Sequence, residues 1–385
     1  MNLKERTAKL LEKLSGLCNN TPEITLDDSN ITIVSKSFTF DQKAYYDYDS
    51  VRNLPQTDFC KISDDKISEN SSFYYYIFYP KDVKKSKRCI LIFHGLNERT
   101  WDKYVNWAEY LAINTNRPVI LFPMAYHINR SPFNWFQGRA ALPWTIKRRI
   151  LFPQAKKATF FNMALSSRIT ISPERFYISG RESVYNINQL ANDIRSGSMD
   201  IFAPECTIDF FSYSIGALLS EVILISDKMK SNESLFSDSR VFMFCGGNLF
   251  ENMDGKAKEI LDEKAFASLK DYYLTEFIKR EPADEIEKAF QIMLSESKYT
   301  KERIEFFDSM RDKLHIIMLK QDYVIPYKGI DKTIGQHNMD LVELMDFPYE
   351  YSHQKLFLVN NKNDADLVYN NFKMVFDKAV NFYKE

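Results

Sequence analysis

A serine stands at an abrupt change of residue pattern near the middle of this 385-residue chain. Residues 207–211 have the apolar and aromatic character of a buried strand, and apolar residues at helical spacing begin directly after Ser214. A strand that turns this sharply into a helix exposes the residue at its apex, and the helix N-terminus supports developing negative charge. The small residues Ser212 and Gly216 let such a turn close. We therefore predict that Ser214 is a nucleophile.

The segment S-Y-S-I-G at residues 212–216 resembles the G-x-S-x-G nucleophile elbow of the α/β-hydrolase superfamily, with a serine in place of the first glycine. The segment CILIFHGLNE at residues 89–98 is similar to the HG-x segment that follows the third strand in that superfamily. The resemblance implies that Gly95 forms a tight turn and that the backbone N–H groups of Leu96 and Ile215 form an oxyanion hole. It also implies supporting roles for Gly216 and for His94, as a brace of the loop.

A serine hydroxyl needs a base to take its proton, and the base needs a carboxylate to orient it. In the superfamily the chain order is serine, acid, histidine, which leaves histidines after Ser214 as candidates. His353 lies in a polar loop between the last predicted strand and the last predicted helix, and we predict it as the base, with His337 as the alternative. Asp322 follows an apolar strand in the order D-x-x-I-P and is the predicted acid.

Two further carboxylates, Glu251 and Asp254, follow the strand that ends at Cys245, where some superfamily members carry the acid. They remain rival candidates for the acid at this point.

Buried apolar runs alternate with helical patterns along the chain and predict a mostly parallel, doubly wound α/β sheet. Such sheets place the carboxyl ends of their parallel strands at one edge, where each candidate residue is expected. The expected strands are residues 31–40, 73–79, 89–93, 118–123, 207–211, 240–245, 314–319 and 341–345. The expected helices are 101–114, 182–194, 215–227 and 366–383, with a charged helical stretch over about 255–312.

The resemblance to α/β-hydrolases covers about residues 85–385 by element order. We predict an N-terminal helical extension over residues 1–30 and a hydrolase domain over 31–385, with insertions at about 127–180 and about 250–312. The second insertion is expected to form a lid over the nucleophile. The first carries a basic cluster of Arg139, Lys147, Arg148, Arg149, Lys156 and Lys157. This cluster, together with Arg130, would either receive an anionic substrate group or form a solvated face.

Composition narrows the class of partner. Lys+Arg 51 against Asp+Glu 52 gives a net charge of −1, which argues against a general nucleic-acid binder. The sequence contains no apolar run long enough for a membrane span and no signal peptide pattern at its start. The five cysteines show no metal-ligand spacing and are expected to be reduced thiols of a cytoplasmic protein. We predict no metal and no cofactor, and oligomeric state is left open.

Two hypotheses of function follow. The first is a serine hydrolase that cleaves a carboxylic ester, or a related thioester or amide, of a small acyl substrate, with ester hydrolysis favoured over peptide hydrolysis. The second is a non-catalytic binding protein on the same scaffold whose pocket is blocked. The chain also resembles an uncharacterised bacterial family built on this fold, which indicates no substrate.

Overall fold

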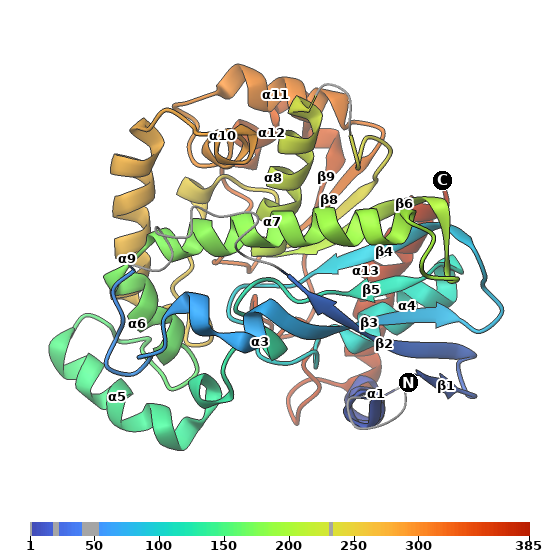
Figure 1. The fold of residues 1–385 in the computed structure, drawn as a ribbon, viewed down its shortest axis with the longest axis horizontal. Helices are drawn as coiled ribbons and strands as arrows, with labels where there is room; N and C mark the ends of the chain where they lie inside the picture. Colours follow the sequence, from blue (N-terminus) through green and yellow to red (C-terminus); the bar gives the residue numbers. More distant parts are fainter. Residues whose placement is uncertain (1, 18–22, 41–53, 231–233) are drawn as a thin grey trace.

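The computed structural model describes residues 2–17, 23–40, 54–230 and 234–385. Within these residues the centre of the molecule is a nine-stranded sheet in the order β1-β2-β3-β5-β4-β6-β7-β8-β9 (Figure 1). Strands β4 to β9 pair in parallel, and β1, β2 and β3 form an antiparallel edge. The strands are β1 (Glu23–Leu26), β2 (Ile31–Thr39), β3 (Ser72–Pro80), β4 (Ser86–Phe93), β5 (Val119–Leu121), β6 (Phe202–Tyr213), β7 (Val241–Phe244), β8 (Leu314–Leu319) and β9 (Val342–Met345).

Helices cover both faces of this sheet. One face packs against α7 (Glu174–Arg195) and α8 (Ile215–Met229), and the other packs against α4 (Val105–Thr115) and α13 (Ala365–Lys384). Because the central strands are covered on both sides, they are nearly continuous apolar runs, and all four residues of β7 are buried. The predicted α/β class with a mostly parallel, doubly wound sheet is confirmed.

The N-terminal segment contributes a strand as well as the expected helix. Helix α1 (Leu3–Leu17) packs against α4, where Asn106 Nδ2 donates to the carbonyl of Leu3 at 3.1 Å. Strand β1 pairs with β2 at the edge of the sheet, a feature that the predicted helical extension did not include. Four residues of mixed polarity at a sheet edge carry too weak a periodic signal to be recognised in the sequence.

Helix α7 begins eight residues before its predicted start. The expectation placed its first residue at Glu182, and the structure places it at Glu174. The first turns present Phe176 and Tyr177 to a pocket instead of to the sheet, and Gly180 interrupts the pattern. The apolar periodicity that marks a core-facing helix therefore starts late.

Two segments after β5 and β7 hold the remaining larger helices. α5 and α6 lie with α9 at one end of the molecule, at the left of Figure 1. Among the described residues no helix has the length and apolar character to cross a membrane. The other helical elements are η2 (Asp64–Lys66), α3 (Ser68–Ser71), η3 (Ile128–Arg130), η4 (Phe133–Phe136), α5 (Gly138–Leu151), α6 (Met163–Ile171), η5 (Phe250–Asn252), α9 (Glu263–Asp271), η6 (Tyr272–Glu276), η7 (Phe277–Lys279), α10 (Glu285–Ile292), α11 (Thr300–Ser309), α12 (Ile330–Ile334) and η8 (Gln336–Leu341).

Candidate active site

Ser214 occupies the single residue between the end of β6 and the start of α8. Its backbone has φ 59° and ψ −127°, a conformation that side-chain-bearing residues rarely adopt. The turn closes against β4, because a Cβ atom at Gly216 would lie 2.7 Å from both the Cβ and the carbonyl oxygen of Phe93. Glycine is therefore required two residues after the serine. The fold holds Ser214 at the apex of a strained turn at the carboxyl edge of the sheet.

The structure brings Ser214, His353 and Asp322 together in one line of hydrogen bonds. His353 Nε2 lies 2.6 Å from Ser214 Oγ, and His353 Nδ1 lies 2.7 Å from Asp322 Oδ2. The serine and histidine are each 3% exposed, and the aspartate is 2% exposed. Since a carboxylate can only accept, Nδ1 carries the ring proton, and the unprotonated Nε2 accepts from the serine hydroxyl.

Asp322 is held on both of its oxygens. It follows the last residue of β8 by three positions, and its Oδ1 accepts from the backbone N–H groups of Val324 at 2.9 Å and Ile325 at 3.0 Å. This leaves Oδ2 directed at His353. The turn after the strand thus fixes the acceptor that orients the imidazole.

Tyr213 supports the histidine, and sequence reasoning did not single it out. Its hydroxyl donates to the carbonyl oxygen of His353, and its ring stacks on the imidazole with centroids 5.2 Å apart and planes 22° apart. The alternation of side chains between the two faces of β6 could have predicted the position of Tyr213. Tyr213 is the residue immediately before the serine, so its side chain points to the sheet face opposite that of Ser212.

The loop after β4 places Leu96 next to Ser214, because both residues line the same cavity. Ile215 is the first residue of α8, so its N–H has no acceptor within the helix. In the described part of the chain, the N–H of Leu96 also has no hydrogen-bond acceptor. Two residues that line the cavity with Ser214 therefore carry backbone N–H groups without an acceptor among the described residues.

His94 makes two hydrogen bonds to the backbone of this part of the chain. Its Nδ1 lies 2.8 Å from the carbonyl oxygen of Gly95, and the N–H of Met124 donates to its Nε2 at 3.0 Å. The ring is completely buried, and burial holds the pKa of His94 well below its usual value. Both ring nitrogens of the neutral imidazole are used in hydrogen bonds to the backbone, which indicates a structural role. These bonds link the loop after β4 to the segment after β5.

The alternative candidates for the acid and the base form hydrogen bonds or ion pairs away from Ser214. Glu251 accepts from Ser295 Oγ at 2.6 Å, and Asp254 pairs with Lys256 at 3.1 Å. His337 lies 2.6 Å from Asp308, with most of its side chain exposed. None of these three groups takes part in the hydrogen bonds around Ser214.

Cys245 adds a third ligand-type group beside the acid and the histidine. Its Sγ and the nearest ligand atoms of Asp322 and His353 all lie within 4.8 Å of one another. Burial, together with the charge of Asp322, raises the pKa of the Cys245 thiol well above its ordinary value. The thiolate is the form that binds metals, so the arrangement is that of a hydrogen-bonded pair next to a neutral thiol. The four cysteines within the described ranges are free, and Cys18 lies outside those ranges.

Ser214 faces a small apolar chamber. The chamber has a volume of about 30 Å³, and its walls include Phe250, Ile260 and Leu261. A second apolar cavity of about 60 Å³ adjoins Leu96 and Ile215 on the side of α7, α8 and α10. A wider groove of about 550 Å³ also has Leu96 in its wall, together with Gln354 and Lys355.

The loop before α9 separates the chamber from the groove. Ile260 and Leu261 line the chamber, whereas Glu259 lines the groove. Asn97 Nδ2 donates to the Glu259 carbonyl at 2.7 Å, and Lys355 Nζ lies 3.5 Å from the Glu259 carboxylate. Contacts from the loop that carries Leu96 and from the loop that carries His353 thus hold this segment over Ser214.

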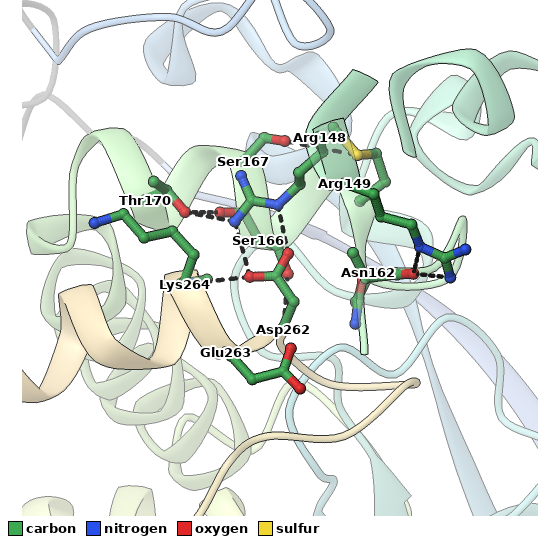
Figure 2. Close-up of polar contacts among 12 residues, drawn as sticks. Arg148, Arg149, Asn162, Ser166, Ser167, Thr170, Asp262, Glu263 and Lys264 are labelled. Carbon is green, nitrogen blue, oxygen red and sulfur yellow. Dashed lines mark hydrogen bonds and ion pairs between the residues drawn. The ribbon is translucent and has the colours of Figure 1, made fainter. Parts of the chain in front are cut away.

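The two predicted insertions are joined by a buried ion pair. Figure 2 shows the guanidinium of Arg148, from α5, between Asp262 at the start of α9 and Thr170 of α6. Arg148 Nη2 lies 2.9 Å from Asp262 Oδ1, and the arginine is 5% exposed. Asp262 also caps α9 by accepting from the N–H of Ala265 at 3.0 Å. These contacts fix the ends of α5, α6 and α9 to one another.

The basic cluster is therefore not a uniformly solvated face. Arg148 is committed to Asp262, and Arg130 is fully buried and pairs with Glu182 at 2.7 Å. Both arginines satisfy internal carboxylates. In these two cases the charge serves the packing of the segment after β5.

Comparisons with known proteins add a family and a set of structural likenesses. Residues 24–384 match a family described as "Family of unknown function (DUF6051)". No curated protein matches the sequence.

Among solved structures the chain is similar to a cold-adapted esterase from an Arctic intertidal metagenomic library, with a TM-score of 0.41 and 7% identity over 94% of this chain and 96% of the other. It is similar to acetyl xylan esterase 1 from Thermoanaerobacterium sp., with a TM-score of 0.40 and 12% identity over 99% and 94% of the two chains. It is also similar to carboxyl esterase 2 from the fungus Tuber melanosporum, with a TM-score of 0.40 and 10% identity over 82% and 83%.

Proposed function

The chain belongs to DUF6051, a family of unknown function, and from the geometry of its site we propose that it is a serine hydrolase. The bond cleaved is a carboxylic ester or a related acyl bond. The observation that carries this proposal is the unbroken hydrogen-bonded line from Ser214 Oγ through His353 to Asp322. Each of these residues is placed by the end of a strand or by a loop at the same edge of the sheet.

In the proposed reaction, Ser214 Oγ attacks the acyl carbonyl carbon while His353 Nε2 takes the hydroxyl proton. The carbonyl oxygen becomes an oxyanion, which the backbone N–H groups of Leu96 and Ile215 stabilise. Collapse of the tetrahedral intermediate breaks the bond to the leaving group, which receives the proton from His353. Water, activated by the same histidine, then releases the acyl group from Ser214.

Asp322 orients the ring of His353 and stabilises the imidazolium that forms during each half-reaction. Tyr213 also positions His353, because its hydroxyl donates a hydrogen bond to the backbone carbonyl of that residue. Support for the acyl class comes from the apolar walls of the chamber that Ser214 faces.

A second candidate function is a binding protein that does not turn over a substrate. The small size of the chamber and the 3% exposure of Ser214 favour it. In that case the contacts of Asn97 and Lys355 with the Glu259 segment would keep the chamber closed to esters.

Labelling with a fluorophosphonate probe separates the two functions. The catalytic proposal predicts covalent labelling of the wild type, no labelling of Ser214→Ala, and hydrolysis of p-nitrophenyl esters by the wild type alone. Absence of wild-type labelling, or equal labelling of the Ser214→Ala variant, would show that the catalytic proposal is wrong.

A further inference from the structure

Two apolar cavities meet beside Ser214, and three residues line both of them. The chamber of about 30 Å³ has Ser214 in its wall, and the cavity of about 60 Å³ lies against α7, α8 and α10. The shared residues are Leu96, Phe176 and Ile215. Ile215 directly follows Ser214 in the chain and Leu96 lies in the loop after β4, whereas Phe176 comes from the first turn of α7.

The ring of Phe176 stands between the aromatic walls of the two cavities. Its centroid lies 5.7 Å from that of Phe250, which lines the chamber, and 6.2 Å from that of Phe290, which lines the second cavity. A third contact, with Tyr273 at 5.8 Å, holds the ring from the side of the α9 segment. Phe176 is thus the aromatic side chain of the partition between the two spaces, which Leu96 and Ile215 also line.

The volumes indicate what each space can take. A cavity needs roughly 10–15 Å³ to hold one water molecule, so the chamber at Ser214 has room for about two water molecules. That space accepts a short acyl group, from acetyl to about butyryl. The second cavity has about twice the volume of the chamber, so the two together offer about three times the space, and the lining of the second cavity is also mostly apolar.

The charged residue in the second cavity is already engaged. Arg181 Nη1 donates to Asp284 Oδ1 at 3.0 Å, and the guanidinium also donates to the hydroxyl oxygens of Tyr177 and Tyr185, both at 2.9 Å. The second cavity therefore suits an uncharged alkyl chain better than a carboxylate. Removing the partition would join two apolar spaces of the kind that bind straight acyl chains.

We propose that Phe176 sets the acyl-chain length of this protein by closing the chamber at Ser214 to all but short acyl groups. The inference rests on the proposed serine hydrolase function. The substrates are esters of straight, uncharged acyl groups of roughly two to four carbons, a range set by the size of the chamber beside the serine. Opening the partition extends the acyl site into the second cavity without adding any catalytic group.

The test measures kcat/KM for p-nitrophenyl acetate, butyrate, hexanoate and octanoate with the full-length protein. The wild type is expected to prefer acetate or butyrate. Phe176→Ala should raise the ratio of kcat/KM for hexanoate to that for acetate by at least about tenfold, because a buried alkyl chain of several methylene groups gains roughly that much or more. Phe176→Trp should lower the ratio for butyrate to acetate.

Phe290→Ala provides the matched control. Phe290 lines only the second cavity, so this change enlarges that cavity and leaves the partition in place. The hexanoate to acetate ratio should stay within about twofold of the wild type. A rise as large as that of Phe176→Ala would overturn the proposal, because chain length would then be limited by the second cavity and not by the partition.

The outcomes also distinguish this inference from the proposed function. Suppose that fluorophosphonate labels Ser214 and short esters are hydrolysed, but Phe176→Ala leaves the hexanoate to acetate ratio unchanged. The inference about Phe176 is then wrong, and the proposed serine hydrolase function is retained. If neither labelling nor hydrolysis occurs in the wild type, both are wrong. Phe176→Leu removes the ring with less loss of packing and gives the same test if the alanine variant does not fold.

Discussion

The carboxylate of Asp322 has one oxygen bound by backbone N–H groups and one by His353. Asp322→Asn keeps the shape but replaces an acceptor with a donor, so the histidine loses the partner that fixes its tautomer. We expect kcat for ester hydrolysis to fall by about 10⁴-fold with the fold unchanged. Steady-state kinetics and circular dichroism measure the two effects.

The rival acids supply the controls for that substitution. Glu251→Gln and Asp254→Asn remove charges that pair with Ser295 and Lys256, away from the hydrogen-bonded line. Both variants should retain kcat within about threefold. If kcat fell by four orders of magnitude in either variant while Asp322→Asn stayed active, the catalytic acid would be a residue of the segment after β7 and not Asp322.

Residues at the strand ends were predictable because each sits in a local pattern with a geometric meaning. Ser214, Asp322 and His353 were all predicted from sequence, and in the structure His353 lies within hydrogen-bond distance of both Ser214 and Asp322. Tyr213 and Cys245 were not predicted as parts of the site. Their contacts depend on which neighbours a sheet brings close, and a single strand's sequence does not contain that information.

At the level of elements, the strand–turn–helix unit around Ser214 depends on close approach to β4. A methyl group at Gly216 would lie 2.7 Å from Phe93 and 2.9 Å from the carbonyl oxygen of His94. Gly216→Ala should therefore lower the free energy of unfolding by about 1–3 kcal/mol, the usual cost of overpacking, and should lower activity by displacing the elbow. Urea unfolding followed by tryptophan fluorescence measures the change in stability.

Gly180→Ala is the matched control for the elbow. Gly180 lies inside α7, and nothing comes within 4 Å of the position that a Cβ atom would take. The same chemical change should here raise the free energy of unfolding by roughly 0.5–1 kcal/mol, because alanine has the higher helix propensity. If both substitutions destabilise equally, the close approach at Gly216 is not the cause.

Elements that face the core were better predicted than elements that face a cavity. Strands β2 to β9 and helices α8 and α13 follow their predicted ranges to within about five residues, since they form or pack against the core of the sheet. The segment between β5 and α7 gave no clear pattern. α5 leaves Ile146 and Ile150 exposed and buries Arg148, so it lacks the apolar face that marks a usual amphipathic helix.

For the whole molecule, the two buried imidazoles make stability depend on pH. Burial lowers the pKa of His127 from its usual 6.5 to about 4, and it lowers that of His94 also. The folded state holds both rings neutral, whereas the unfolded chain protonates them below about pH 6.5. The unfolded state therefore binds more protons, so the stabilisation is complete above that pH and is lost as the pH falls from 6.5 toward 4.

His127 alone should account for about 3 kcal/mol of that loss, since one pKa unit corresponds to 1.36 kcal/mol. The His127→Gln variant cannot titrate there, so its free energy of unfolding should fall less between pH 7 and pH 4.5. Urea midpoints at the two pH values give the comparison. An unchanged difference between the midpoints would mean that the ring is not held neutral in the folded protein.

The bond between Arg148 and Asp262 spans 114 residues of chain. During synthesis, therefore, the arginine leaves the ribosome long before its carboxylate exists, by roughly 6–23 s at 5–20 residues per second. Throughout that interval α6 offers the guanidinium the hydroxyl of Thr170 but no carboxylate. The buried ion pair that joins α5 to α9 therefore forms only after α9 has been synthesised, which makes it a late step in the folding of the segment after β5.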